Sequence, residues 1–238
     1  MKPRSIRFGV VIPLLLAAAA PADAATIQLP RTGQTTCYDA TGVIIDCAGT
    51  GQDGDKRAGA PWPLPRFTDN GNGTVTDNLT GLIWLKDANC TDAVGGITRD
   101  GGLLNWSSAL AWCNNLAHGR CGLTDASERG DWRLPNIIEL KSLVDHSRHD
   151  PDLPGGHPFT NVQSVWYWSS TSNPVYAAGA FTVGISRGSI HVTDKRPGPF
   201  GSSNVSGKDR GALGVGPVRG GELARGRQKP AATAPSAP

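Results

Sequence analysis

The stretch Asp131-Trp132-Arg133-Leu134-Pro135-Asn136-Ile137-Ile138-Glu139-Leu140 marks where this chain changes from extended to helical structure. A proline keeps the residue before it out of the α region, so no helix runs through Leu134. Asn136 is a good N-cap, and Glu139 stands three residues further on, which is the spacing of a capping box. Apolar residues then recur at helical spacing, and the pattern predicts a helix of about ten residues that ends near Asp145.

This helix needs a partner for its apolar face. The run from Trp166 to Thr171 is aromatic and β-like, and we expect the helix to pack against it. Upstream, strand-like runs flank Asn-Gly pairs and predict an antiparallel meander from Arg66 to Leu85. A second helix is predicted from Trp106 to Ala117, after Asn105 as a possible cap.

Further strands are predicted towards the C-terminus. The runs from Ala178 to Ile185 and from Ile190 to Val192 indicate a hairpin, and Leu213 to Arg219 is suited to a last strand. Strands, two helices and then more strands predict an α+β domain of mostly antiparallel strands.

The N-terminus has the three parts of a secretory signal peptide. Basic residues precede an apolar run from Phe8 to Ala20, and Ala22-Asp23-Ala24 is a small-x-small cleavage site. Residues 1–24 are therefore predicted to be removed, and the protein is predicted to be exported, whether periplasmic, extracellular or at the cell surface. No later stretch reaches the roughly 20 apolar residues of a membrane helix.

Charge is unevenly distributed along the chain. The full sequence carries a net charge of +3, and removing Lys2, Arg4, Arg7 and Asp23 with the signal lowers it to +1. Residues 195–238 hold eight basic and two acidic residues. Residues 222–238 are predicted to be a disordered, basic, Ala/Pro-rich tail. A basic end also favours polyanions or an acidic surface.

All five cysteines follow the signal, and disulfides are the default in an exported chain. Cys37 and Cys47 flank a predicted hairpin around Thr41-Gly42 and are expected to pair. Cys113 and Cys121 are also near neighbours and are expected to pair, which leaves Cys90. Pairing of Cys90 with Cys113 or with Cys121 is an open alternative.

One polar turn is a candidate calcium loop. Asp69, Asn70, Asn72 and Asp77 offer oxygen ligands in a Gly-rich segment, but no glutamate stands at the twelfth position. The pattern favours an Asn-Gly hairpin over a metal site, and we expect no cofactor. His146, His149 and His157 could also ligate a metal, but surface histidines near a helix end are favoured.

Two segments resemble catalytic or phosphate-binding motifs, but neither has the full pattern. Gly184 to Gly188 has the spacing of a nucleophile elbow, but a β-like run follows where a helix is required. Gly201 to Lys208 has the wrong spacing for a phosphate loop. We therefore expect a protein that is not an enzyme. Of the seven tryptophans, Trp62 and Trp166 are the candidates for exposed binding surfaces, and the other five are expected in the core.

The motifs together resemble the C-terminal domain family of the Legionella collagen-like adhesin, a domain of unknown function. The resemblance covers residues 66–221 and rests on five ordered motifs: the stretch from Asp69 to Trp84, Asp131 to Leu143, His157-Pro158-Phe159, Tyr167 to Thr171, and Pro217 to Gly221. The chain departs from the family pattern in three ways. It has no Gly-x-y collagen stretch upstream, Gly214 and Gly216 stand where relatives usually carry aromatic residues, and residues 197–212 are predicted to be an insertion.

The resemblance implies a C-type-lectin-like fold and a non-catalytic binding role. In the named adhesin the domain resembles a head that attaches to sulfated polysaccharides. We therefore expect an adhesin-like module that binds a glycan, a sulfated polysaccharide or another surface polyanion, and no nucleic acid. A short disulfide-hairpin arm, residues 25–65, is expected to precede the domain. The alternatives are an envelope or extracellular assembly protein and, third, an enzyme of the formylglycine-generating group, which needs reactive cysteines.

Overall fold

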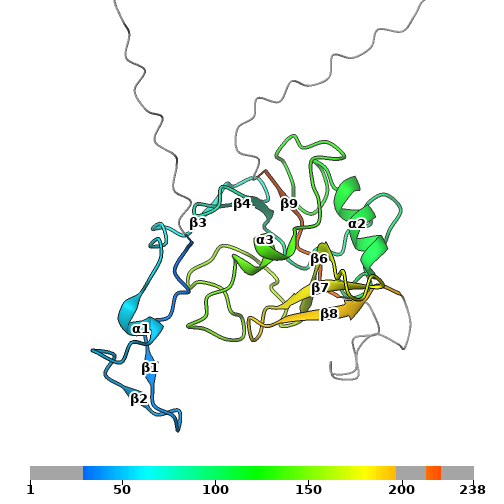
Figure 1. Cartoon of the computed structure of the whole chain (residues 1–238). Helices are drawn as coiled ribbons and strands as arrows, with labels where there is room; N and C mark the ends of the chain where they lie inside the picture. Colours follow the sequence, from blue (N-terminus) through cyan, green and yellow to red (C-terminus); the bar gives the residue numbers. More distant parts are fainter. Residues whose placement is uncertain (1–28, 197–212, 221–238) are drawn as a thin grey trace, which may run out of the picture.

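The computed structural model describes residues 29–196 and 213–220. Figure 1 shows a small arm, residues 29–65, standing to one side of a larger domain, residues 66–220. The predicted signal peptide, the predicted insertion at residues 197–212 and the predicted basic tail lie outside the described residues.

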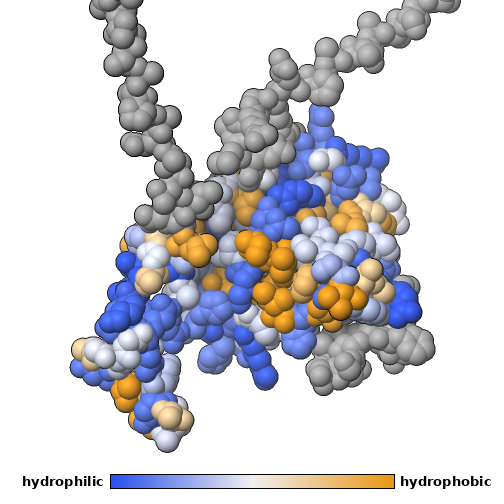
Figure 2. All heavy atoms as spheres, viewed as in Figure 1, coloured by the Kyte–Doolittle hydropathy of each residue, from blue (hydrophilic) through white to orange (hydrophobic). Residues whose placement is uncertain are grey.

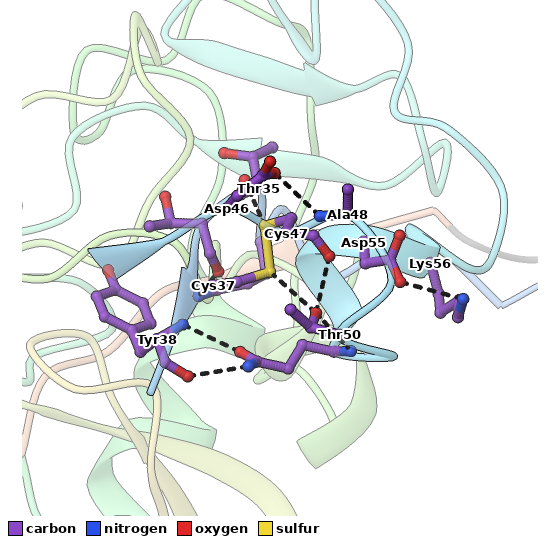
Figure 3. The surroundings of a disulfide bond; sticks show 12 residues. Thr35, Cys37, Tyr38, Asp46, Cys47, Ala48, Thr50, Asp55 and Lys56 are labelled. Carbon is purple, nitrogen blue, oxygen red and sulfur yellow. Dashed lines mark hydrogen bonds and ion pairs between the residues drawn. A yellow bond between two sulfur atoms is a disulfide. The ribbon is translucent and has the colours of Figure 1, made fainter. Parts of the chain in front are cut away.

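The arm is a hairpin closed by a disulfide. Strands β1 (Cys37–Tyr38) and β2 (Ile44–Ile45) pair antiparallel. Gly42 has φ +87° and donates its N–H to the Asp39 carbonyl, which is the tight turn that Thr41-Gly42 predicted. Cys37 and Cys47 form the disulfide expected from this hairpin, shown in Figure 3.

A one-turn helix packs against this disulfide. Helix α1 (Asp53–Lys56) lies so close to it that a Cβ on Gly54 would meet the Cys37 sulfur at 2.8 Å. The Gln52 side chain joins α1 to β1, because its amide donates to the Tyr38 carbonyl at 2.9 Å. The sequence had not predicted α1, which brings the described helices to three.

The first sheet of the domain is the predicted meander with one added strand. Its order is β3 (Phe67–Asp69), β4 (Thr74–Asp77), β5 (Ile83–Leu85) and β9 (Val218–Arg219), and all neighbours are antiparallel. The strand predicted at residues 213–219 is therefore shorter than expected.

The second sheet is the predicted aromatic strand and the predicted hairpin. Strands β6 (Trp166–Ser172), β7 (Gly179–Gly184) and β8 (Ile190–Asp194) pair antiparallel in that order. Gly214 lies beside β6, where a Cβ would meet the Tyr167 ring at 2.9 Å. The buried Tyr167 ring thus takes the space that a side chain at position 214 would need.

Both predicted helices form, with the predicted caps. Helix α2 (Trp106–Asn115) begins after Asn105, whose side chain accepts the Ser108 N–H. Helix α3 (Ile137–Lys141) has the complete capping box of Asn136 and Glu139 and packs against β6 and β7.

The predicted length of α3 is wrong. The helix has five residues, and beyond it the Val144 N–H bonds to the Lys141 carbonyl in a tighter turn. The Asp145 N–H leaves the helical pattern altogether, because it donates to the Asp152 carbonyl at 2.8 Å. The chain thus leaves the helical pattern for a tertiary hydrogen bond, although its apolar spacing favours a longer helix.

Two apolar clusters form the core of the domain. One gathers around α2 and β6, and the other lies under α3 between the two sheets. Trp84, Trp112, Trp132 and Trp168 are fully buried, as predicted, whereas Trp106 is only partly buried at the edge of the first cluster. Within the described ranges no helix is long and apolar enough to cross a membrane.

The expected pairing of Cys113 with Cys121 is wrong. Cys121 pairs with Cys90, and Cys113 is a buried free cysteine on α2. Asp92 draws the Cys90 loop to this position, because its carboxylate accepts the Cys121 N–H at 2.7 Å. Cys113 instead faces the core with no exposed surface.

Candidate functional site

The predicted calcium loop is a hydrogen-bonded turn. Asp69 forms an ion pair with Lys86 at 2.7 Å. The Asn70 amide donates to two threonine hydroxyls, and the Asn72 side-chain oxygen accepts from Thr74 at 2.7 Å. The turn therefore uses its polar atoms internally, as an Asn-Gly hairpin does.

Asp77 lies away from this turn. It stands opposite Phe67 in the β3–β4 register, and its carboxylate is fully buried. That carboxylate accepts hydrogen bonds from Arg66 at 2.8 Å and from the Leu79 N–H and the Thr80 hydroxyl. The structure does not bring Asp77 together with the other three candidate ligands.

The three histidines also remain separate. The His146 N–H donates to the Thr32 carbonyl of the arm, and His157 packs against Phe159. Among the described residues, the group of three His, Cys, Asp or Glu side chains close enough for a metal is Cys90, Asp92 and Cys121. Its two sulfurs are joined in a disulfide and are not available as thiolates.

The two tryptophans predicted to be exposed are both half-buried. Trp166 lies against His191, with ring centroids 4.4 Å apart, and covers Gly184. Trp62 lies at the border between the arm and the domain, and its indole N–H donates to the Arg31 carbonyl at 2.9 Å. Trp62 also lines three hollows of the surface.

Three adjacent hollows share Trp62, and we call them together the seam. Their volumes are about 310, 410 and 750 Å³. The arm lies close to the domain here because residue 33 is a glycine with φ +89°, and a Cβ at this position would meet Trp62 and the Asp145 carboxylate. Figure 2, which has the same view as Figure 1, shows hydrophilic residues prominent on the arm.

Cationic side chains outnumber carboxylates along the seam. The carboxylates are those of Asp53 and Asp145. The hollows are also lined by five cationic residues: Arg31, Arg57, Arg66, Lys141 and Arg148. His146 adds a titratable group, whose pKa is lowered by burial and by the nearby Lys141 charge.

Arg66 is a buried cation in the largest hollow of the seam. Its Nη2 donates to Asp77 at 2.8 Å and to the Ser142 carbonyl at 3.1 Å. The guanidinium carbon lies 5.1 Å from the Trp62 ring centroid and 4.8 Å from that of Phe67. Burial lowers the pKa of Arg66 and the Asp77 charge opposes this, but an arginine stays charged in either case.

Sequence reasoning missed Arg66 and Arg148. The short segment Trp62-Pro63-Leu64-Pro65-Arg66 carried one signal, since it joins an aromatic and a cationic residue through two stiff prolines at the predicted border of the domain. Nothing in the sequence places Arg148 beside it, because the two are far apart along the chain.

The fold and the seam define a class of protein. The described residues form three antiparallel sheets, short helices and two disulfides, features that suit an exported binding domain. The sequence model of the Lcl C-terminal domain matches residues 73–201, more than half of the chain, and the chain belongs to this family. No curated protein and no solved structure matches it. The matched range contains Arg148 but begins after the arm and Arg66.

Proposed function

We propose that this protein is an exported, non-catalytic binding module that recognises a glycan or another surface polyanion, as an adhesin does. The observation that carries the proposal is membership of the Lcl C-terminal domain family, which indicates an adhesin-like domain. The proposal includes a C-type-lectin-like arrangement of the two sheets and the helices. The step from family to ligand is made by analogy.

The seam supports this function physically. Hollows with an aromatic side chain and a few charged groups are the usual form of a binding site for small polar ligands. The excess of cations attracts acidic partners, and the attraction weakens as salt screens it.

A glycan array tests the proposal. The purified chain from Ala25 onwards, made under export conditions so that both disulfides form, is applied with calcium and with chelator. We expect selective binding to a subset of glycans that is equal in both buffers, because Asp77 is committed to Arg66. A blank array contradicts the proposal, and a strict calcium requirement contradicts the assignment of the Asp69–Asn72 turn as a simple hairpin.

A second candidate function is assembly with another protein. The arm exposes apolar side chains at its tip, including Val43 at 59% and Ile44 at 68%. Exposed apolar groups that cluster on one hairpin favour a protein contact. A pull-down with the natural chain, compared with a Val43→Ser, Ile44→Ser chain, tests this: a partner captured equally by both chains contradicts it.

A further inference from the structure

Arg66 is a buried cation with unused hydrogen-bonding capacity. The residue is only 6% exposed, yet its Nε and Nη1 have no acceptor among the described residues. Buried polar groups without partners are rare, and each calls for an explanation in terms of a ligand, a water or a functional role. Arg66 lines the largest hollow of the seam. Its Nε and Nη1 atoms are covered, so an occupant of that hollow supplies the acceptor once the Arg66 side chain shifts towards it.

The carboxylate that lines this hollow, Asp145, already accepts hydrogen bonds from other residues. Asp145 Oδ1 accepts from the backbone N–H and the hydroxyl of Ser147 at 2.9 and 2.6 Å, and Oδ2 pairs with Arg148 Nε at 3.4 Å. Both oxygens of the Asp145 carboxylate therefore already have partners. The side-chain groups that remain available here are therefore mainly donors.

Arg148 supplies the second of these donors. Its side chain is 53% exposed, and within the described part of the chain it forms an ion pair with Asp145. The guanidinium end lies beside Gly155, where a Cβ would meet Nη2 at 2.5 Å. A guanidinium presents a planar fork of N–H groups that matches the oxygens of a carboxylate or a sulfate.

Trp62 adds an apolar surface beside these two cations. It lines all three hollows, so a ligand longer than one unit can extend from it in more than one direction. An indole offers a flat apolar face for the C–H side of a sugar ring, with charged groups at its edge.

We propose that the seam binds an acidic sugar unit, whose carboxylate or sulfate group is held by Arg66 and Arg148 while its ring lies against Trp62. The inference rests on the proposed function and assigns its site. Because Trp62 and Arg66 precede the matched range, the arm completes a site that residues 73–201 alone do not contain.

The test measures affinity by titration calorimetry with three oligosaccharide probes of equal length. One is heparin-derived and carries sulfate and carboxylate, one is hyaluronan-derived and carries carboxylate alone, and one is a neutral dextran fragment. The chains compared are the natural one, Arg148→Gln, Trp62→Ala and, as a matched control, Arg129→Gln, which changes an exposed arginine that does not line the seam.

We expect the natural chain to bind at least one acidic probe and to bind the neutral probe more weakly. Arg148→Gln should weaken acidic binding about tenfold, since a charge-assisted hydrogen bond is lost. Trp62→Ala should weaken it to a similar extent, and Arg129→Gln should leave it unchanged. The ranking of the two acidic probes distinguishes a sulfate ligand from a carboxylate ligand.

Two results distinguish an error in the proposed site from an error in the proposed function. Acidic binding that persists in both seam variants, or a preference for the neutral probe, overturns the seam site and leaves glycan recognition intact. No binding of the natural chain to any probe or array glycan overturns both. If Trp62→Ala loosens the arm, as its thermal unfolding would show, the exposed Arg148→Gln variant decides the question alone.

Discussion

The arm and the domain differ in how many of their apolar side chains are buried. In the arm Val43 and Ile44 are exposed, and Cys37 is the one buried hydrophobic residue between positions 29 and 65. The domain holds four fully buried tryptophans in two apolar clusters. Hydrophobic burial therefore stabilises the domain, whereas a disulfide and local hydrogen bonds stabilise the arm. The arm can be a part of the binding surface without being a part of the core.

The largest loss of stability is expected from a change at the border between the two regions. Arg66→Met removes one partner of a buried ion pair and leaves the fully buried Asp77 carboxylate without its cation. We expect the free energy of unfolding to fall by about 3 to 5 kcal/mol. Urea unfolding followed by tryptophan fluorescence measures the change.

The control for Arg66 is Lys86→Met, which removes an exposed partner of Asp69. Exposed ion pairs contribute about 0 to 1 kcal/mol, so this variant should unfold close to the natural chain. Equal losses in the two variants would show that the Arg66–Asp77 pair contributes no more than a surface contact.

The two disulfides should differ in what they stabilise. Cys90 and Cys121 are 31 positions apart in the sequence, and the double change to alanine should lower the free energy of unfolding of the domain by about 3 to 4 kcal/mol in the chain-entropy model. The same change at Cys37 and Cys47 should leave the main transition nearly unchanged and make the arm sensitive to protease. Calorimetry and limited proteolysis check both, and a large shift of the main transition in the arm variant would contradict the separation.

The reactivity of the Cys113 thiol reports whether the core of the domain excludes reagents. Burial raises the pKa of its thiol well above the usual range, so the reactive thiolate is scarce. A thiol reagent should find no fast-reacting group in the folded protein and one thiol per chain after unfolding without reductant. Peptide mapping that recovers Cys113 linked to Cys121 would contradict the observed pairing.

The smallest effect is expected at the tip of the arm. Val43→Ser and Ile44→Ser should change the free energy of unfolding by less than about 0.5 kcal/mol, since both side chains are exposed. The same change at Val183, which is fully buried in β7, should cost about 2 kcal/mol or more. Denaturant midpoints of the three variants show whether burial explains the contrast.

Features that depend on near neighbours were predictable. The start of α3, its capping box, the Asn-Gly turns and the Cys37–Cys47 pair all involve residues a few positions apart. The antiparallel meander followed because short turns leave consecutive strands little choice of partner. The family resemblance, drawn from five motifs, is confirmed by the match over residues 73–201.

The errors involve residues that interact across long separations. Helix α3 is half its predicted length, and beyond it Asp145 bonds to the distant Asp152. Cys121 pairs with Cys90, and a hydrogen bond from the Cys121 N–H to Asp92 joins the same two loops. The sequence pattern grouped Asp77 with the turn at Asp69. In the structure its carboxylate is buried and binds Arg66 instead.

By itself the sequence determined where turns, caps and apolar faces lie, because these depend on backbone preferences and spacing over a few residues. Only the tertiary structure decided which distant groups meet. Trp62, Arg66 and Arg148 form the seam because the arm folds back against the domain at Gly33, and the hydrogen bond from His146 to Thr32 holds it there. Such contacts arise from packing and from the satisfaction of buried polar groups, which no local pattern encodes.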